Sequence, residues 1–357
     1  MGIRSNGLLT SNFQIIGSVF QDHLQNNDEA LLAYNQAYEI LTEHETPTDP
    51  PAEPRFILSQ LQYRIGLCLS NSAHHRKCTT TRDPNQEVSC QEMAAHAFSQ
   101  AVEFDPQNIN AKHMLASLTA DATMKKASNE YVKSLFDDYA TNFEHSLVEE
   151  LGYDGYARLR RVFDKGMASE GIDVNGHNFD TVLDAGCGTG LVGEQFRNVS
   201  SYLIGVDLSE AILDEAEKMR PKLYDERIVG DVAEVIRSKQ PLSLIVAADS
   251  FIYFGDLVPL FESIRDGLEV GGYIAFTLEN VGSEDESILS ESKPDWRWQL
   301  TASGRFAHRK EYIADIGTQF GLQVVHYEAL DGFRHELGND VRGRAFLMKK
   351  KAPHDEL

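Results

Sequence analysis

The stretch that decides the fold is residues 181–191, which read TVLDAGCGTGL. Thr181–Ala185 is mostly apolar and predicts a buried strand, and a helix is predicted from about Leu191. Between them lie Gly186, Gly188 and Gly190. Glycine lets a ligand approach the backbone, because it has no side chain and accepts positive φ. The stretch therefore predicts a strand, a ligand-binding turn and a helix.

Strands and helices continue to alternate after this turn. Apolar segments that predict further strands lie at residues 201–206, 227–229, 243–248, 272–278, 323–327 and 344–348. Such alternation predicts an α/β fold with a mostly parallel sheet, covered by helices on both faces. Ligands of such folds bind at the carboxyl ends of the strands.

The glycine turn has the pattern Asp-x-Gly-x-Gly-x-Gly, beginning at Asp184. Nicotinamide and flavin enzymes use a similar turn, so the glycines alone do not identify the ligand. The residue three positions after Gly188 is Leu191, where a pyrophosphate fingerprint has glycine or alanine. The spacing therefore argues against a dinucleotide.

Two further aspartates follow the next two predicted strands. Asp207 lies 21 residues after Gly186, at a strand end where a carboxylate can accept both hydroxyls of a ribose. Asp231 follows the third strand, where its side chain and a backbone N–H can meet an adenine edge. We expect Leu208 and Val232, the next residues in the chain, to line the same site.

These residues together resemble the cofactor site of class I S-adenosylmethionine-dependent methyltransferases, over Asp180 to about Lys350. The resemblance implies a seven-stranded Rossmann-like methyltransferase sheet and S-adenosylmethionine as cofactor. It also implies that the glycine turn holds the methionine portion, Asp207 the ribose and Asp231 the adenine. Carboxylates suit this cofactor, which has no phosphates and carries a sulfonium and an ammonium group. A nicotinamide-binding domain is the alternative.

The N-terminal third predicts an all-α domain of tetratricopeptide-like repeats over residues 1–127. Two helix pairs repeat glycine, alanine and aromatic positions: Phe13, Ile16, Gly17, Phe20, Ala30, Tyr34 and Ala37, then Ile65, Gly66, Leu69, Ala94, Phe98 and Ala101. Plain amphipathic helices are the alternative. The chain resembles a methyltransferase subgroup that carries such repeats, which implies linking or lid helices at 128–179 and a catalytic domain at 180–357.

Two inserts, residues 44–54 and 71–89, predict surface loops because they are rich in proline, polar and turn residues. The second holds His74, His75 and Cys78, with Cys90 just beyond it, but their spacing matches no tight zinc site, so we expect no metal. The four cysteines form no CxxC pair, which predicts free thiols in a reducing compartment.

A predicted helix within 125–151 carries Tyr131, Leu135, Tyr139 and Phe143 at every fourth position, which places them on one face. The simplest interpretation is a linking amphipathic helix. In the methyltransferase family such a helix commonly lies over the cofactor. The resemblance therefore implies that Tyr131 and Tyr139 contact it.

The residues after the fourth strand should face the transferred methyl group. Asp249 could hold the amino group of the cofactor, orient an acceptor amine or simply end the strand. Tyr253 and Phe254 could form an aromatic wall near the cation or belong to the core.

Further acceptor-side candidates lie near the last predicted helix and the sixth strand. His308 could be a general base or only a helix-start residue. Arg305 and Arg334 could clamp a substrate carboxylate or form internal ion pairs. Trp298 lies in a loop that could form a lid or substrate wall.

Composition narrows the partners. The 357 residues are 42% hydrophobic and 25% charged, as in ordinary globular proteins, with a net charge of -22 that would repel nucleic acids and anionic membranes. No apolar run reaches the length of a membrane span. The chain ends in the ER-retention sequence HDEL, but its N-terminus predicts no signal peptide, so we expect a cytoplasmic protein.

The leading functional hypothesis is methylation of a small metabolite that bears a carboxylate, at an oxygen, nitrogen or sulfur acceptor. The alternative is a protein methyltransferase whose repeats dock a polypeptide, since helical repeats offer concave binding surfaces. The repeats could also mediate self-association.

Overall fold

The computed structural model describes residues 11–23, 26–42, 52–71, 77–79, 87–119, 123–281, 283–336 and 339–352. The chain divides into two compact units. Unit 1 comprises Met1–Asp121 with Thr301–Gly304, and unit 2 comprises Ala122–Leu300 with Arg305–Leu357. The predicted loop 44–54 lies largely outside the described residues, as do His74, His75 and the C-terminal HDEL.

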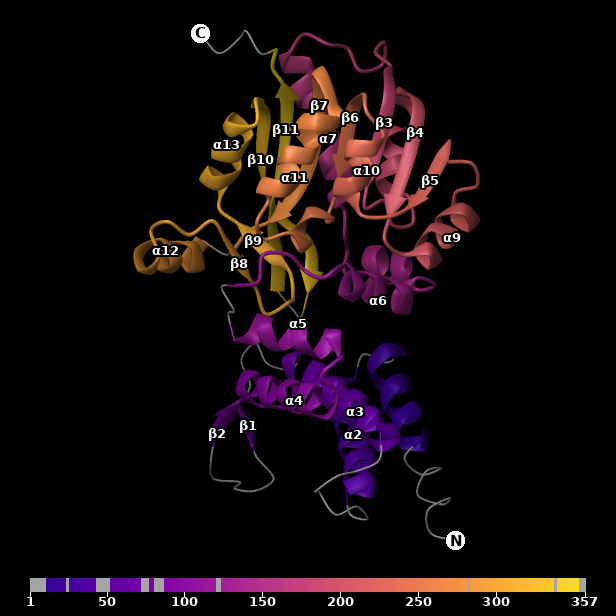
Figure 1. The fold of residues 1–357 in the computed structure, drawn as a ribbon, viewed down its shortest axis with the longest axis vertical. Coiled ribbons are helices and arrows are strands. Elements are labelled where there is room, and N and C mark those ends of the chain that lie inside the picture. The colour runs from indigo at the N-terminus through magenta and orange to yellow at the C-terminus, as the bar shows by residue number, and fades with distance from the viewer. Residues whose placement is uncertain are drawn as a thin grey trace. The chain divides into compact units, whose positions relative to one another are not determined.

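Unit 2 is built on a twisted sheet in which every predicted strand is present (Figure 1). The strands are β3 (Phe179–Ala185), β4 (Ser200–Asp207), β5 (Glu226–Val229), β6 (Leu242–Ala247), β7 (Leu268–Glu279), β10 (Leu322–Glu336) and β11 (Asn339–Lys350). Their order is β10-β11-β7-β6-β3-β4-β5. β3 to β7 are parallel, whereas β11 runs antiparallel to β7 and β10 antiparallel to β11.

The expected count of seven strands is wrong, because the sheet includes two more. β8 (Trp298–Leu300) and β9 (Phe306–His308) form an antiparallel pair in the predicted loop, and Ala307 pairs with Glu279 at the end of β7. Edge pairing satisfies the backbone groups of this insert, which its composition did not reveal.

Helices cover both faces of the sheet. One face packs against α10 (Val232–Ser238), α11 (Val258–Gly267) and α13 (Lys310–Gln319), and the other against α7 (Gly155–Ser169), α8 (Leu191–Phe196) and α9 (Glu210–Met219). Side chains alternate between the two cores: Leu183 and Ala185 enter the first, and Val182 the second. Both faces of these strands are buried, as in most parallel sheets.

The segment before the sheet is not one continuous helix. α6 (Asn129–Tyr139) ends before a turn at residues 140–142, and the π-helical η2 (His145–Glu150) follows. The ring of Phe143 meets that of Phe136 edge-on at 5.5 Å. The predicted single face through Phe143 is therefore wrong, because the chain turns after Tyr139 and Phe143 packs against α6.

Unit 1 contains helix 11–18, the π-helical η1 (Val19–His23), α2 (Asn27–Thr42), α3 (Ala52–Asn71), α4 (Cys90–Phe104) and α5 (Ile109–Leu118). It is not all-α. The second predicted loop contains an antiparallel hairpin, β1 (Lys77–Thr79) with β2 (Glu87–Ser89). Cys90 is disulfide-bonded, so the expectation of four free thiols is wrong, while Cys68 and Cys187 are free and buried.

The two helix pairs of unit 1 repeat one packing contact. A Cβ added at Gly17 would lie 2.5 Å from the ring of Tyr34, and one at Gly66 would lie 2.5 Å from the ring of Phe98. Each ring is flanked by fully buried alanines at the same offsets: Ala30 and Ala37, then Ala94 and Ala101. Glycine at the first position is what lets each aromatic ring approach the neighbouring helix.

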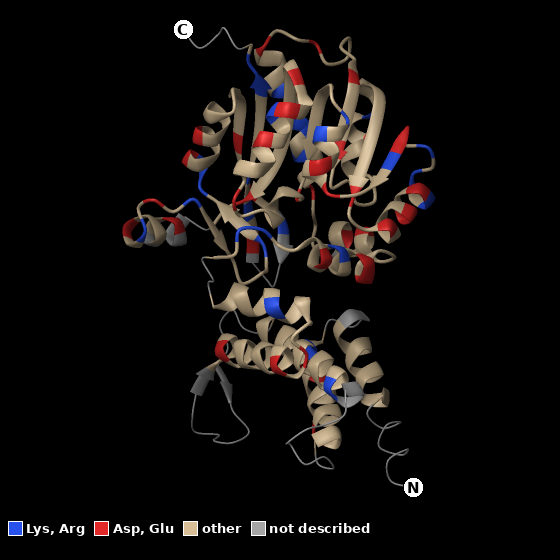
Figure 2. Ribbon diagram, in the orientation of Figure 1, with Lys and Arg blue, Asp and Glu red and all other residues tan. Residues whose placement is uncertain are grey.

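The remaining elements are η3 (Arg197–Val199), η4 (Phe251–Tyr253) and α12 (Ser283–Ser292). α12 carries a run of acidic residues (Figure 2). Within it, both oxygens of Glu286 accept hydrogen bonds from Arg344, at 2.8 and 2.9 Å. Among the helices described, none has the length and apolar character of a membrane span.

Candidate functional site

The glycine turn lies at the carboxyl end of β3. Gly186, Gly188 and Gly190 all adopt positive φ, of 74°, 52° and 98°. The amides of Gly186 and Cys187 donate to the carbonyl of Val206 at the end of β4, both at 2.9 Å. A Cβ on Gly186 would come within 2.2 Å of the Ser250 hydroxyl, so the turn can pass this point only as glycine.

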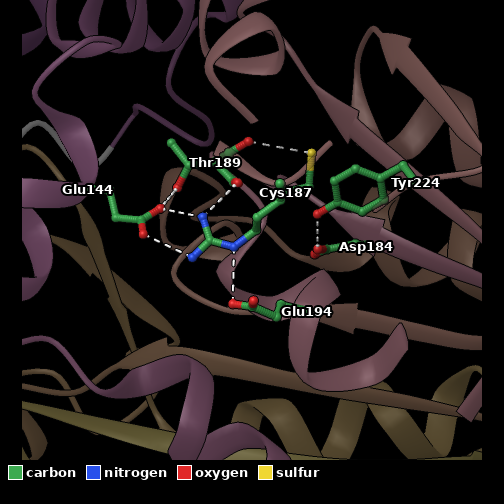
Figure 3. A network of polar contacts seen from close by, with 8 residues as sticks. Glu144, Asp184, Cys187, Thr189, Glu194 and Tyr224 are labelled. Carbon is green, nitrogen blue, oxygen red and sulfur yellow. Dashed lines mark hydrogen bonds and ion pairs between the residues drawn. The ribbon is translucent and has the colours of Figure 1, made fainter. Parts of the chain in front are cut away.

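Asp184 supports the turn from inside the core. Its side chain is fully buried, and its Oδ2 accepts a 2.7 Å hydrogen bond from the hydroxyl of Tyr224 (Figure 3). Burial raises the pKa of Asp184 to about 7, against the lowering effect of the Tyr224 hydroxyl and the Gly193 amide. A fully buried carboxylate does not reach a bound ligand directly, so its effect on the site acts through the turn.

Asp207 joins the turn to the end of β4. Its Oδ2 accepts from the amide of Gly188 at 3.1 Å, and its Oδ1 accepts from the amide of Ser209 at 3.0 Å. Burial raises its pKa, although its hydrogen bonds from backbone amides oppose that rise. Leu208 is half-buried and packs beside α6 and η4.

Asp231 caps α10, where its Oδ1 accepts from the amide of Ala233 at 2.8 Å. Its Oδ2 forms a 2.6 Å ion pair with Lys126, whose ammonium also lies 4.6 Å from the centre of the Phe254 ring. Burial raises the pKa of Asp231, but the hydrogen bond and attraction to Lys126 outweigh it and lower the pKa. Val232 follows as the first residue of α10 and is buried.

The segment from Lys126 to Glu144 covers this edge of the sheet, and we call it the lid. Tyr131 is buried with Ile252 and Tyr253 in one apolar cluster, whereas Tyr139 is 46% exposed. Contact of either tyrosine with a cofactor therefore stays a prediction.

Polar contacts join the lid to all three aspartate-bearing loops. Lys126 pairs with Asp231, as described above, and Asp137 accepts a 2.5 Å hydrogen bond from Ser209, next but one to Asp207. Glu144 accepts from Thr189 of the glycine turn at 2.6 Å and from Arg220 at 2.7 and 2.9 Å (Figure 3). The lid is thus fastened to each loop that the sequence assigned to the cofactor.

The residues present fit the predicted cofactor. The turn has positive φ at three glycines, of which Gly186 and Gly188 are partly exposed, and the next two strand ends each carry a carboxylate. Asp207 and Asp231 each have oxygens that accept hydrogen bonds, which suits hydroxyl and amino groups. A cationic, phosphate-free ligand is the class that such a donor set favours.

His308 is placed differently from a surface base. It lies in β9, fully buried, with Nε2 3.1 Å from the carbonyl of Gly255. Because a carbonyl can only accept, Nε2 carries the proton, and Nδ1 has no hydrogen-bond partner among the described residues. Burial lowers the pKa of His308 to about 4, so the ring is neutral at physiological pH. A role as general base would require a rearrangement of this strand.

Trp298 in β8 packs against the backbone of Gly255 and the ring of Tyr312, whose centroid lies 5.6 Å away. The side chain is half-buried and joins the core beneath α11 and α13. This contact favours a structural part for Trp298, and a substrate contact stays a prediction.

Asp249 and Arg334 meet at the carboxyl ends of β6 and β10. Arg334 is 2% exposed and donates to Asp249 Oδ2 at 2.5 Å and to Glu279 Oε1 at the end of β7. The internal ion pair that we gave as the alternative for Arg334 is therefore present. Arg305 Nη1 lies 3.8 Å from the same Glu279 oxygen.

Tyr253 adjoins this group and is almost fully buried. Its ring meets Phe136 of the lid edge-on at 5.9 Å. Burial raises the pKa of Tyr253, against a hydrogen bond and attraction from Arg305. The sequence left Tyr253 as either an aromatic wall near the cation or a core residue, and its packing is that of a core residue.

Sequence reasoning missed four residues that shape the site: Lys126, Glu144, Arg220 and Glu279. None belongs to a motif, and each acts through a partner distant in the chain, such as Asp231 for Lys126. A weak signal was available. The chain has 55 acidic residues against 33 lysines and arginines, so a basic side chain is expected to have an acidic neighbour in the fold.

The comparisons with known proteins bear on the same region. Residues 182–272, from β3 into β7, match the family described as "Methyltransferase domain". Over these residues the chain is similar to a methyltransferase domain. This match supports the predicted enzyme class, an S-adenosylmethionine-dependent methyltransferase, for this part of the chain. The prediction of tetratricopeptide-like repeats is confirmed only as far as a helical N-terminal unit.

Curated relatives of this methyltransferase domain are similar over part of their length. A malonyl-[acyl-carrier protein] O-methyltransferase of Yersinia pestis is 28% identical over 134 residues, 38% of this chain and 48% of the relative. One of Salmonella typhimurium is 20% identical and covers 56% of this chain and 70% of the relative. The biotin biosynthesis bifunctional protein BioHC of Teredinibacter turnerae is 25% identical, and the alignment covers 50% of this chain and 32% of the relative. The chain thus spans about half the length of the first relative and a third of BioHC.

Among solved structures, a magnesium protoporphyrin IX methyltransferase of Synechocystis, with bound S-adenosylhomocysteine, aligns with a TM-score of 0.42 and 13% identity. The alignment covers 61% of this chain and all of that one.

Proposed function

We propose that this protein transfers a methyl group from S-adenosylmethionine to a carboxylate oxygen of a small acceptor. The observation that carries the proposal is that the candidate base His308 is buried, whereas an arginine near it in the chain, Arg305, is partly exposed. His308, the candidate base, is buried and neutral, while Arg305 and Arg334 lie at the carboxyl ends of the strands.

This arrangement suits a nucleophile that arrives already ionised. S-adenosylmethionine, when bound, supplies an electrophilic methyl group. A carboxylic acid has a pKa of about 4, so its carboxylate needs no general base at neutral pH. What the protein must do is neutralise and align the anion, and a guanidinium does both. The names of the malonyl-[acyl-carrier protein] relatives agree with an acceptor that bears a free carboxylate.

The proposed cofactor residues are those that the family resemblance implies, and the hydrogen bonds that join the three loops support them. We propose that the backbone of the turn at Gly186, Gly188 and Gly190 holds the methionine portion and Asp207 the ribose. Asp231 and the amide of Val232 would meet the adenine. Asp184 would act by supporting the turn, since its carboxylate is fully buried.

The acceptor residues are proposed separately. Arg305 is the anion-binding residue, because its side chain is 20% exposed whereas that of Arg334 is 2% exposed and held by two carboxylates. Asp249 holds Arg334 in place, and Tyr253 lines the wall between the lid and Arg305.

Isotope-labelled S-adenosylmethionine tests the acceptor atom. The protein would be incubated with the malonyl thioester of N-acetylcysteamine, a set of other small carboxylates and a whole protein extract. A methyl ester releases labelled methanol on mild alkaline treatment, whereas N-methyl and S-methyl products do not. Base-stable label on a small molecule, or label on protein alone, would overturn the proposal.

The helical unit is proposed to be tetratricopeptide-like, with self-association or a protein partner as its role. Support comes from the repeated glycine-to-aromatic contact, Gly17 with Tyr34 and Gly66 with Phe98, together with the identical alanine offsets. Size-exclusion chromatography with light scattering over a range of concentrations tests self-association.

A further inference from the structure

Four charged side chains of alternating sign form a line at the carboxyl edge of unit 2. In order they are Asp249, Arg334, Glu279 and Arg305, with side chains 14%, 2%, 7% and 20% exposed. Taking charges out of water is costly and is offset only where partners are close and well oriented. Apolar residues at these positions would give equal or greater stability, so stability alone does not account for the four charges.

The two ends of the line lie at different parts of the site. Asp249 adopts a φ of 52°, a left-handed conformation that disfavours non-glycine residues. It is held there by Arg334 and by Thr277, whose hydroxyl accepts from its amide at 2.9 Å. The next residue, Ser250, packs against Gly186. The line therefore runs from the cofactor turn to Arg305.

Glu279 is the link between the two arginines. Its Oε1 accepts from Arg334, whose position is fixed in turn by Asp249. The same oxygen lies 3.8 Å from Arg305, close enough for attraction but too far for a hydrogen bond. Glu279 is itself fixed by the backbone, as the last residue of β7, where it pairs with Ala307 of β9. Without its charge, the two guanidinium groups would lose the carboxylate that both of them approach.

We propose that Glu279 is a positioning residue that sets the direction of the Arg305 guanidinium toward the anionic group of the acceptor. The inference rests on the proposed function, because it assumes that Arg305 binds a carboxylate. An arriving acceptor carboxylate then continues the alternation of charge. Affinity for the acceptor depends on Glu279, whereas binding of the cofactor at the far end of the line does not.

Glu279→Gln tests this in the full-length protein, because glutamine keeps the shape and an accepting oxygen for Arg334 while removing the charge. With the malonyl thioester of N-acetylcysteamine as acceptor, KM should rise about tenfold or more, as expected for loss of a charge-assisted contact. The kcat and the S-adenosylhomocysteine affinity, measured by calorimetry, should stay within about twofold. Glu279→Asp keeps the charge and should recover part of the loss.

Arg305→Ala and the Arg305→Ala/Glu279→Gln double variant complete the cycle. If Glu279 acts through Arg305, the KM of the double variant equals that of Arg305→Ala alone, and additive effects would overturn the inference. An unchanged KM in Glu279→Gln would do the same. If Glu279→Gln fails to fold, shown by lost S-adenosylhomocysteine binding, the comparison of Glu279→Asp in the presence and absence of Arg305 decides the matter. A wild-type protein that methylates no carboxylate would refute the proposed function itself. That result differs from the outcomes above, which all compare KM values of active proteins.

Discussion

Replacing Asp184 by asparagine should make the stability of unit 2 less dependent on pH. Folding buries this carboxyl group completely and raises its pKa from 3.8 to about 7. Below pH 3.8 the group is protonated in both states. Between 3.8 and about 7 the unfolded chain has lost the proton while the folded protein still holds it, so stability falls as the pH rises.

The size of the effect follows from the shift. Each pKa unit corresponds to about 1.4 kcal/mol, so the buried group lowers stability by about 4 kcal/mol at pH 8 and by about 1.6 kcal/mol at pH 5. In Asp184→Asn the Oδ1 can still accept from Tyr224. The new Nδ2 replaces an oxygen without a hydrogen-bond partner among the described residues, a cost that does not depend on pH. The free energy of unfolding of the variant, relative to that of the wild type, should therefore rise by about 2 to 3 kcal/mol between pH 5 and pH 8.

Urea unfolding at the two pH values measures this gain. Trp296 and Trp298 are the two tryptophans of the chain and both belong to unit 2, so their fluorescence reports on the unit that contains Asp184. Asp180→Asn is the matched control, since Asp180 is exposed on the same strand. If the stability difference between Asp184→Asn and wild type is the same at pH 5 and pH 8, the carboxyl group is not held protonated by burial and the reasoning fails.

Three other predictions concern the helical unit, the lid and the ribose site. Gly66→Ala places a Cβ 2.5 Å from the Phe98 ring and should destabilise unit 1 by about 1 to 3 kcal/mol, measured by thermal melting followed by circular dichroism. Glu144→Gln removes the charge that pairs with Arg220 and should speed release of S-adenosylhomocysteine several-fold in stopped-flow measurements, because the lid is held less firmly. Asp207→Asn should weaken S-adenosylmethionine binding about tenfold or more in calorimetry, since a carboxylate no longer accepts from the ribose.

Two of these predictions have a control variant, and the third has an outcome that would contradict it. A Cβ on Gly176 would have its nearest neighbour at 3.9 Å, so Gly176→Ala should leave the melting temperature nearly unchanged. Glu149 is 71% exposed, and Glu149→Gln should release the product at the wild-type rate. Equal effects of Glu144→Gln and Glu149→Gln would show a general influence of charge rather than the lid contact. An Asp207→Asn protein with unchanged affinity would remove the ribose assignment.

Local pattern predicted the sheet well. Thr181–Ala185 and the glycines after it form the expected strand and turn, because an apolar run and a glycine-rich turn are patterns of residues adjacent in the chain. The repeated spacing of alanines around an aromatic residue in unit 1 is equally local, because each set lies within one helix. β8 and β9 were not predicted. Such short strands form because they pair with each other and with the end of β7, and their own composition does not indicate that pairing.

For the site, the sequence by itself determined which strand ends carry carboxylates and that the turn after the first strand is rich in glycine. Tertiary structure alone decided which of these groups meet. It buried His308 and Asp184, paired Arg334 with Asp249 and Glu279, and joined Glu144 to Arg220 across 76 positions of the chain. The physical reason is that a side chain's charge state and partners depend on burial and on distance in space, and spacing along the chain fixes neither.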